Sequence, residues 1–168
     1  MYKLFNFFDK ISNYIMRVLK ITYWKIRYGK RIRIGKKLHF RKRFNILIEK
    51  NGMLEIGDNC FFNNDCSINC ISNIKIGDDN LFGENVRIYD HNHKFSNKEI
   101  YQNEFTLSKI SIGNNNWIGT NVIILGKTKI ENKNVIGAGV ILNFNIGNGK
   151  LVTQGRKDIN IENIRSEK

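Results

Sequence analysis

Hydrophobic residues recur at every sixth position along the C-terminal half of the chain. The series starts at Ile112 and keeps its interval through six aliphatic residues: Ile112, Ile118, Ile124, Ile130, Ile136 and Leu142. A second series lies four positions behind the first: Asn116, Val122, Thr128, Asn134, Val140 and Ile146. An amphipathic helix would repeat every ~3.6 residues and a half-buried strand every ~2, so neither explains the pattern. The interval predicts an all-β solenoid of triangular section, in which three hexapeptides make a coil of about 18 residues.

Glycine follows several of these inward residues, and the same pairing extends the pattern toward the N-terminus. Earlier Ile-Gly pairs occur at three places: Ile34-Gly35, Ile56-Gly57 and Ile76-Gly77. We expect the glycine, or an asparagine in its place, to accommodate the tight corner after each inward residue. The phase of the repeat shifts by two residues between Ile74 and Ile76. The solenoid is therefore predicted to span residues 30–158, with residues 159–168 as a C-terminal tail.

The segment from His93 to Ser108 interrupts the pattern. It is polar and has no Ile-Gly pair, although the interval from Ile88 to Ile112 is a whole number of hexapeptides. We interpret residues 93–108 as a loop extruded from the solenoid between two intact coils. Long loops in compact domains are usually functional, so this loop is the first place to look for chemistry.

Residues 1–29 follow helical spacing instead. Their apolar side chains share one face at intervals of three and four positions: Leu4, Phe8, Ile11, Ile15, Val18 and Thr22. Basic side chains occupy much of the remaining surface: Lys3, Lys10, Arg17 and Lys20. The segment predicts an amphipathic α-helix with two alternative roles. It could cap the open end of the solenoid or pack against a subunit, or it could lie on an anionic membrane leaflet.

The charge of the protein is concentrated in the same region. The chain has 28 Lys and Arg against 15 Asp and Glu, a net charge of +13, and residues 1–50 contain 15 of the basic and two of the acidic residues. We therefore expect this excess of positive charge to determine where the protein binds, either on a membrane through residues 1–43 or beside an anionic substrate. No nucleic-acid partner is expected, because no DNA- or RNA-binding motif accompanies the basic residues.

Three cysteines, Cys60, Cys66 and Cys70, are an odd number for a disulfide framework and lack the spacing of a zinc site. We expect Cys60 and Cys66 to fill small inward positions as reduced thiols. No apolar run reaches the ~18–20 residues of a membrane span, and residues 1–24 lack the compact apolar stretch of a signal peptide. The expected location is the cytoplasm, with the inner face of the membrane as the alternative.

Three motifs together resemble a known family. They are Ile76-Gly-Asp-Asp-Asn-Leu-Phe-Gly83, then Tyr89-Asp-His-Asn-His-Lys94, then the stretch from Ile112-Gly-Asn-Asn-Asn-Trp-Ile-Gly-Thr120 to Val135-Ile-Gly-Ala-Gly139. They are similar to the left-handed parallel β-helix acyltransferases, which are built from hexapeptide repeats. Within these the motifs resemble the galactoside, maltose and capsular-polysaccharide O-acetyltransferase branch. The resemblance implies a homotrimer that transfers acetyl from acetyl-CoA to a sugar or glycan hydroxyl, in capsule, O-antigen or exopolysaccharide biosynthesis, with no metal expected.

The resemblance places the catalytic base on His93, immediately before the extruded loop. Histidine suits the step because its ordinary pKa lies near neutrality, so it can take the proton of an attacking hydroxyl. His91 is the alternative base, and Asp90 is the candidate to orient an imidazole. His39 lies in a basic early segment and is expected to be structural or simply exposed.

The resemblance also suggests residues that bind the two substrates. Asp65 matches a position where this branch often has an acceptor-binding asparagine, and a carboxylate there accepts a hydrogen bond but donates none. Asn85 is a second acceptor-binding candidate. The residues implied in CoA binding are Trp117, Gly119, Thr120, Gly137, Ala138, Gly139, Lys127, Arg156 and Lys157, with Lys129 as a further basic candidate. The family's usual Gly-x-Pro-Ala-Lys ending is replaced here by Gly155-Arg-Lys-Asp158, so the resemblance does not specify the contacts to the CoA phosphates.

Three other functions compete with this interpretation. A γ-class carbonic anhydrase shares the solenoid and binds zinc through three histidines, but His39 should lie several coils from His91 and His93. A non-catalytic solenoid binding protein would explain the repeats but not the combination of Trp117 and His93. Within the acyltransferases, N-acetylation of an amino-sugar nucleotide is the main alternative to O-acetylation.

Overall fold

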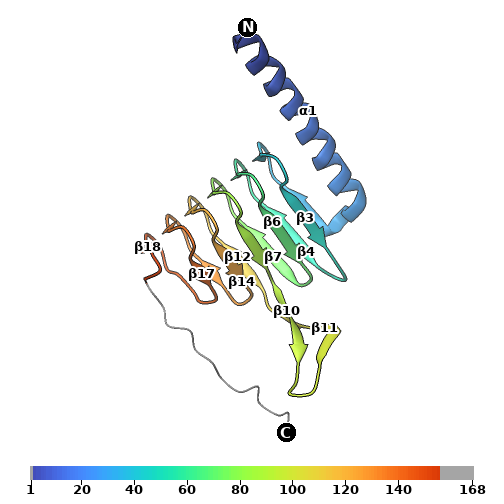
Figure 1. Ribbon diagram of the computed structural model, residues 1–168, viewed down its shortest axis with the longest axis vertical. Coiled ribbons are helices and arrows are strands. Elements are labelled where there is room, and N and C mark those ends of the chain that lie inside the picture. The colour runs from blue at the N-terminus through green and yellow to red at the C-terminus, as the bar shows by residue number, and fades with distance from the viewer. Residues whose placement is uncertain (1, 156–168) are drawn as a thin grey trace.

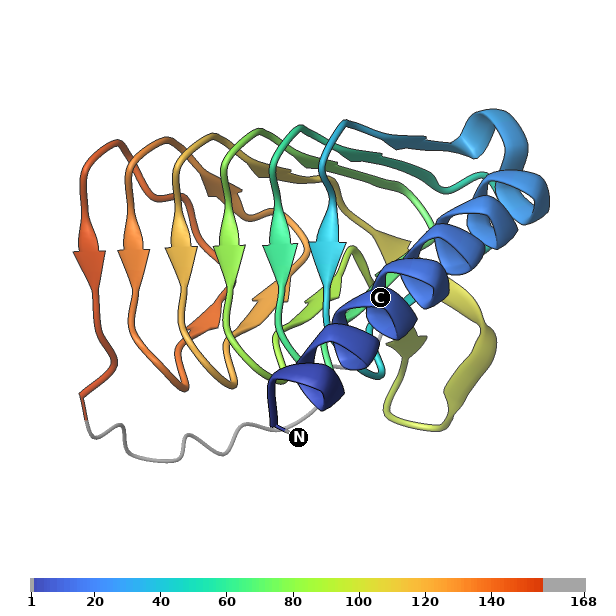
Figure 2. The same ribbon diagram turned by 90° about the horizontal axis from the view of Figure 1, so that it is seen from above.

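A computed structural model describes residues 2–155 of the chain, with side chains from residue 11 onward. The chain begins with helix α1 (Tyr2–Tyr28) and a single 3-10 turn, η1 (Gly29–Arg31). It then winds into stacked coils that form a three-sided prism (Figures 1 and 2). Each face of the prism is a parallel sheet to which successive coils contribute one short strand apiece.

The three faces are lettered here in the order in which the chain visits them. Face A contains β1 (Ile32–Ile34), β4 (Met53–Ile56), β7 (Asn73–Ile76), β12 (Ile110–Ile112) and β15 (Lys129–Ile130). Face B contains β2 (His39–Phe40), β5 (Phe61–Phe62), β8 (Leu81–Phe82), β13 (Trp117–Ile118), β16 (Val135–Ile136) and β18 (Leu151–Val152). Face C contains β3 (Asn45–Ile48), β6 (Ser67–Cys70), β9 (Arg87–Tyr89), β14 (Ile123–Leu125) and β17 (Ile141–Leu142).

The strand register gives the length of each coil. Ile34 pairs with Ile56 and Ile56 with Ile76, so the first two coils contain 22 and 20 residues. Ile112 pairs with Ile130, an interval of 18 residues, whereas Ile76 pairs with Ile112 across 36. The longer coil accommodates the antiparallel hairpin of β10 (His91–Phe95) and β11 (Ile100–Leu107). The predicted left-handed parallel β-helix with an N-terminal helix and one extruded segment is confirmed.

The prism is filled by the residues of the two six-residue series, which are buried from Ile112 to Ile146, whereas Ile34 and Phe40 in the first coil are half-buried. Cys60, Cys66 and Cys70 are at most 1% exposed, and burial raises the pKa of each thiol, that of Cys66 to about 11. The first coils differ from the later ones because aromatic rings stack along their core. The ring centroids of Phe44 and Phe62 lie 4.4 Å apart, and those of Phe62 and Phe82 lie 4.2 Å apart.

The expected role of glycine in the corners is wrong, and the corners show why. At Gly57 a β-carbon would lie 2.3 Å from Asp78 Oδ1 and 2.7 Å from the Gly77 carbonyl oxygen, so glycine permits coils to stack closely. The left-handed backbone of the same corner is adopted two residues later, by Asn59 at φ 55°. Corresponding corners use Asn, Asp and Lys: Lys37, Asp79, Asn115 and Lys133. Asparagine and aspartate tolerate this conformation better than most residues, so the corner signal lies in the polar positions.

Helix α1 covers the N-terminal end of the prism with the side opposite to its predicted apolar face. Trp24 and Tyr28 are 1% and 5% exposed, and the Trp24 ring lies edge-on to Phe44 at 5.5 Å. The Tyr28 hydroxyl donates a hydrogen bond of 3.0 Å to the Ile46 carbonyl. The face predicted to be apolar, which includes Ile11 and Ile15, instead points away from the coils and is exposed. In Figure 1 the N-terminal part of α1 extends beyond the coils. Within residues 2–155, no helix is long and apolar enough to cross a membrane.

Candidate active site

The hairpin corner is our name for the junction of faces C and A, from which β10 and β11 leave the prism (Figure 1). Asp90 lies at the base of the hairpin and is completely buried. The Asp90 carboxylate accepts hydrogen bonds from the backbone N–H groups of Ile71, at 2.9 Å, and Ser72, at 2.8 Å. Its own carbonyl accepts one from the Ser108 N–H at 2.8 Å. Asp90 therefore ties both ends of the hairpin to the preceding coil.

His91 is the imidazole that Asp90 contacts. Its Nδ1 lies 3.0 Å from Asp90 Oδ1, and its side chain is 15% exposed. A carboxylate at this position favours the tautomer with the proton on Nδ1, which leaves Nε2 as an acceptor. A cleft of about 380 Å³ at the base of the hairpin is lined by His91 together with Asn92, Gly126 and Lys127.

His93 lies farther along β10 and is exposed. Its Nδ1 is 3.4 Å from the Tyr101 carbonyl oxygen, and its ring packs against Phe105 with centroids 4.6 Å apart. Because a carbonyl can only accept, this contact requires the proton on Nδ1 and leaves Nε2 free to take a proton. The imidazole that Asp90 contacts is that of His91, whereas the favoured base, His93, is oriented by the backbone of β11.

Lys50 contributes to this corner from the first coil. Its Nζ donates a hydrogen bond of 3.1 Å to the Asn103 carbonyl and lies 4.5 Å from the centre of the Phe105 ring. Sequence analysis did not single out Lys50 or Phe105. The contact spans 53 residues, and its only sequence signal is a basic residue at the same corner of an earlier coil.

The asparagine corner is our name for the junction of faces B and C. Residues 63–65, 83–85, 119–121 and 137–139 stack there, coil upon coil, through backbone hydrogen bonds. The Gly139 N–H donates to the Thr120 carbonyl at 2.9 Å, and the Asn85 N–H to the Asn64 carbonyl at 2.9 Å. The corner thus collects most of the residues expected to bind the two substrates.

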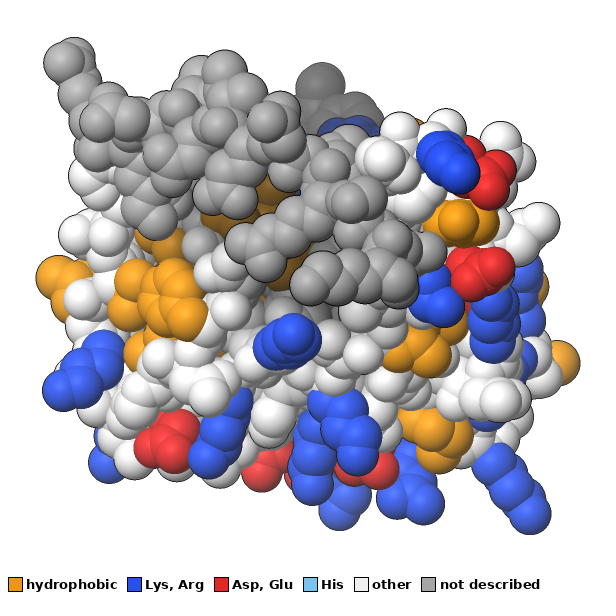
Figure 3. Space-filling model, turned by 90° about the horizontal axis from the view of Figure 1, so that it is seen from below, with side chains coloured by type: hydrophobic (Ala, Val, Ile, Leu, Met, Phe, Trp, Pro, Cys, Tyr) orange, Lys and Arg blue, Asp and Glu red, His pale blue; other side chains and the backbone are white. Residues whose placement is uncertain are grey.

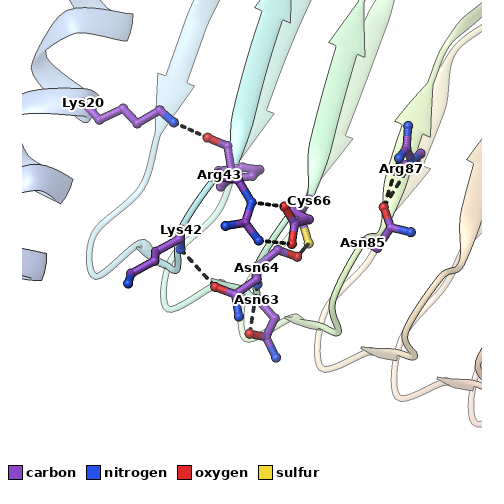
Figure 4. A network of polar contacts seen from close by, with 10 residues as sticks. Lys20, Lys42, Arg43, Asn63, Asn64, Cys66, Asn85 and Arg87 are labelled. Atoms are coloured by element: carbon purple, nitrogen blue, oxygen red, sulfur yellow. Dashed lines mark hydrogen bonds and ion pairs between the residues drawn. The ribbon is translucent and has the colours of Figure 1, made fainter.

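The side chains of Asp65 and Asn85 already have protein partners in this corner. Two guanidinium nitrogens of Arg43 contact the Asp65 carboxylate, one of them at 2.7 Å (Figure 4). The hydrogen bond from Arg43 holds the pKa of the Asp65 carboxyl below its ordinary value, so this group is an acceptor at neutral pH. The Asn85 amide donates to Asn121 Oδ1 at 2.6 Å, and its oxygen accepts from Arg87 at 3.1 Å.

Arg43 is therefore a further residue that sequence analysis missed. It precedes Asp65 by 22 residues, which is the length of the first coil, so the two stack directly upon each other. The coil length is the signal that could have revealed the pair, but it becomes known only from the register of the strands.

The remaining cofactor candidates flank the asparagine corner or lie elsewhere. The indole of Trp117, on β13, is 54% exposed on face B. Gly119 is buried, Gly137 is half-buried, and Ala138 and Gly139 are exposed. A β-carbon at Gly139 would meet no atom within 4 Å, so the backbone there is open to a ligand. Lys127 lies at the hairpin corner and Lys129 on face A. Arg156 and Lys157 lie outside the described residues.

A single chain does not bring the two corners together. The histidines lie at the junction of faces C and A, whereas Asp65, Asn85 and the 137–139 backbone lie at the junction of faces B and C. Face C, with its core-filling residues, stands between them. His39, on β2 of face B, is likewise separate from His91 and His93. Within residues 2–155, no group of three or more His, Cys, Asp or Glu side chains lies close enough to hold a metal ion.

Comparison with known proteins connects this fold to a group of enzymes. Residues 109–143 match the family described as bacterial transferase hexapeptide (six repeats). The structure of a maltose O-acetyltransferase from Clostridium difficile 630 is 29% identical over 76% of this chain and 67% of its own, with a TM-score of 0.63. A galactoside acetyltransferase in complex with coenzyme A is 29% identical over 64% of this chain and 56% of its own, with a TM-score of 0.52.

A third structure supports the fold. A hexapeptide-repeat containing acetyltransferase from Vibrio cholerae O1 biovar eltor, complexed with acetyl coenzyme A, has a TM-score of 0.66 at 22% identity, over 80% of this chain and 71% of its own. The resemblance that the motifs indicated is confirmed by these similarities. In its repeats and its fold the chain is similar to hexapeptide-repeat acyltransferases of the left-handed β-helix type, and these similarities support an acyltransferase enzyme.

Proposed function

We propose that this acyltransferase moves an acetyl group from acetyl-CoA to a hydroxyl of a sugar, in the assembly of a surface glycan. The observation that carries the proposal is the setting of His93. Its Nδ1 faces the Tyr101 carbonyl at 3.4 Å, its ring is supported by Phe105, and its Nε2 is left for an acceptor hydroxyl. The similarity to a maltose O-acetyltransferase and a galactoside acetyltransferase supports a sugar as the acceptor.

The reaction follows from this geometry as a direct transfer. Nε2 of His93 takes the proton of the sugar hydroxyl while the oxygen attacks the thioester carbonyl. The backbone N–H of Thr120 is the proposed donor to the oxygen that becomes negative, because the N–H of Gly119 already donates to the Ile136 carbonyl at 2.8 Å. When the C–S bond breaks, the thiolate of CoA leaves and the proton on His93 passes to it. The products are the acetylated sugar and free CoA, and the histidine regains its starting state.

The asparagine corner fits the CoA arm of the substrate. Its backbone at Gly139 is open to close approach, and the exposed Trp117 indole offers an apolar surface beside the corner. We assign Asp65 and Asn85 to the acceptor, because both lie along this corner and their oxygen atoms, which already accept from Arg43 and Arg87, each have a second lone pair for a sugar hydroxyl. Basic side chains would meet the CoA phosphates: Lys127 and Lys129 lie within the described residues, and Arg156 and Lys157 lie beyond them.

A homotrimer completes the site in this proposal. One prism keeps its hairpin corner and its asparagine corner apart, so both substrates can be held near His93 if the hairpin corner of one chain faces the asparagine corner of the next. A cyclic arrangement of three chains would form three such sites.

An acceptor screen tests the proposed function. Purified protein is supplied with acetyl-CoA and with free sugars, nucleotide sugars, amino-sugar nucleotides or lipid-linked glycans, and release of the CoA thiol is measured. We expect release with a hydroxyl acceptor and a loss of about 10²–10⁴-fold in His93→Ala, the usual contribution of a general base. His39→Ala, which removes another exposed histidine, is the matched control and should keep full activity.

Two results would contradict parts of the proposal. Acetylation confined to amines would replace O-acetylation by N-acetylation of an amino sugar. Full activity in His93→Ala, with a comparable loss in His91→Ala, would move the base to the imidazole that Asp90 contacts.

A further inference from the structure

The outward face of α1 is a continuous apolar surface with no place in the proposed reaction. Ile11, Ile15, Leu19 and Ile26 lie at helical spacing on this face and are 40%, 50%, 60% and 79% exposed. Met16, Val18 and Tyr23 lie beside them and are also exposed. No charged residue lies on the face between Ile11 and Ile26, because every Lys and Arg of this stretch falls on the flanks or toward the coils.

This surface is separate from the one that holds the helix to the prism. Trp24 and Tyr28 bury the opposite side of α1 against the first coil, so docking of the helix leaves the outward face uncovered. On the coils, exposed apolar side chains also lie next to one another on face B, where Leu81, Trp117 and Leu151 follow the strand register. On the face seen from below, the hydrophobic groups on the right of the view lie among Lys, Arg, Asp and Glu, and a broader hydrophobic group lies on the left (Figure 3). A stripe of large apolar side chains on one helix is typical of an interaction surface.

The positive charge around the outward face of α1 restricts the kind of partner that can bind there. Lys25 and Arg27 immediately precede and follow Ile26, so at helical spacing they flank the apolar face on its two sides, and both are exposed. Between Asp9 and Glu49 the chain has thirteen Lys and Arg and no acidic residue. Pairing this face with the same face of a second copy would bring these positive charges together. A surface that offers both negative charge and an apolar interior is complementary to it.

We propose that α1 docks the enzyme onto an anionic lipid bilayer, with Ile11, Ile15, Leu19 and Ile26 inserted at the headgroup–acyl boundary and Lys25 and Arg27 against the lipid phosphates. The helix lies in the plane of the membrane and does not cross it. This inference is independent of the proposed reaction, because it concerns a surface that the hairpin and asparagine corners do not share.

Co-sedimentation of the full-length protein with lipid vesicles tests the proposal. Vesicles of phosphatidylcholine alone are compared with vesicles that contain about 30% phosphatidylglycerol, in low salt and in about 0.5 M salt. We expect binding to the anionic vesicles that weakens with salt, and little binding to the neutral ones. The triple variant Ile15→Ser/Leu19→Ser/Ile26→Ser should bind about 100-fold more weakly, because membrane affinity scales with the apolar area inserted.

Two matched controls make the experiment specific. The variant Ile100→Ser/Ile141→Ser/Leu151→Ser removes apolar side chains that are 71%, 46% and 73% exposed on the hairpin and the later coils, and it should bind like the wild type. Lys25→Gln/Arg27→Gln should lose about 25-fold in affinity, roughly fivefold for each charge. Lys98→Gln/Lys109→Gln, which removes two exposed charges from the hairpin region, should lose little.

Each opposing outcome would overturn the proposal. Equal binding to neutral and anionic vesicles would show that Lys25 and Arg27 do not contact lipid phosphates. Unchanged binding of Ile15→Ser/Leu19→Ser/Ile26→Ser would show that the outward face of α1 does not insert. If the wild type does not bind vesicles but the triple variant changes the oligomeric state in analytical ultracentrifugation, a second copy of the chain covers the face. Circular dichroism of each variant establishes that α1 and the coils remain folded.

Discussion

The hairpin corner and the asparagine corner arise from the same repeat, but only the hairpin corner departs from it. The hairpin corner is interrupted by the segment that forms β10 and β11, and it holds His91 and His93 together with the buried Asp90. The asparagine corner keeps the repeat, and its left-handed residues stack at constant positions: Arg43, Asp65, Asn85, Asn121 and Gly139. The interrupted corner therefore supplies titratable groups, whereas the regular corner supplies an ordered backbone edge. We therefore expect proton transfer at the hairpin corner and substrate binding at the asparagine corner.

Mixing of subunits would test this division most strongly. His93→Ala alters the hairpin corner, and Trp117→Ala alters the strand that leads into the asparagine corner; each alone should reduce acetyl transfer by two orders of magnitude or more, as for a positioned catalytic group. If each site is formed by the hairpin corner of one chain and the asparagine corner of another, random trimers from an equal mixture regain about a quarter of the wild-type sites. Thiol release by co-refolded protein is measured against each variant refolded alone. A mixture no more active than the average of its components would place the whole site within one chain.

Loss of Asp90 should weaken the hairpin corner more than any other single polar change. Asp90→Ala leaves the buried N–H groups of Ile71 and Ser72 without their acceptor. We expect a decrease of about 2–4 kcal/mol in the free energy of unfolding, measured by urea denaturation. Asp58→Ala removes an exposed carboxylate that accepts a hydrogen bond from the Lys36 N–H, and should change stability by less than about 1 kcal/mol. Equal effects of the two substitutions would contradict a special role of Asp90.

The asparagine corner should be destabilised when a side chain is added at one of its glycines. In Gly119→Ala the new β-carbon would lie 2.7 Å from the Ile136 carbonyl oxygen and 2.8 Å from the Ala138 nitrogen. We expect a destabilisation of about 1–3 kcal/mol, seen as a lower Tm, because the neighbouring coil must move away. Gly147→Ala, where a β-carbon meets nothing within 4 Å, is the control and should be neutral or slightly stabilising. A neutral Gly119→Ala would show that close stacking is not required at this corner.

The smallest expected effect concerns Cys66, just inside the asparagine corner. Burial raises the pKa of this thiol to about 11, and the thiol donates a hydrogen bond of 3.0 Å to the Gly83 carbonyl. Above pH ~9 the unfolded chain loses this proton while the folded chain keeps it, so stability falls as pH rises, by about 1 kcal/mol at pH 10. Cys66→Val, the residue type found at this position in later coils, should reduce the fall. Urea denaturation between pH 8 and 10 measures the slope, and an unchanged slope would contradict the assignment.

Much of the fold could be predicted, because burial repeats with the period of the coil. The inward series from Ile112 to Leu142 and the slots for Cys60 and Cys66 follow directly from that period, and the structure buries them all. The reason given for the glycines was wrong, since close stacking depends on the neighbouring coil and not on the local corner. The side of α1 that packs on the coils could not be predicted either. Trp24 packs on Phe44 because the open end of the prism offers an aromatic surface, whereas the pattern of the helix pointed to its other side.

The sequence by itself determined the solenoid, the place of its interruption and the residue types available for acyl transfer, because each of these depends on local spacing within one or two hexapeptides. The tertiary structure alone decided which groups meet. The register of the first coil places Arg43 over Asp65, and face C separates the histidines from the asparagine corner. Such contacts depend on how many residues each coil contains and on what covers its ends. Those quantities are set by the stacking of segments distant in the chain, so local patterns do not carry them.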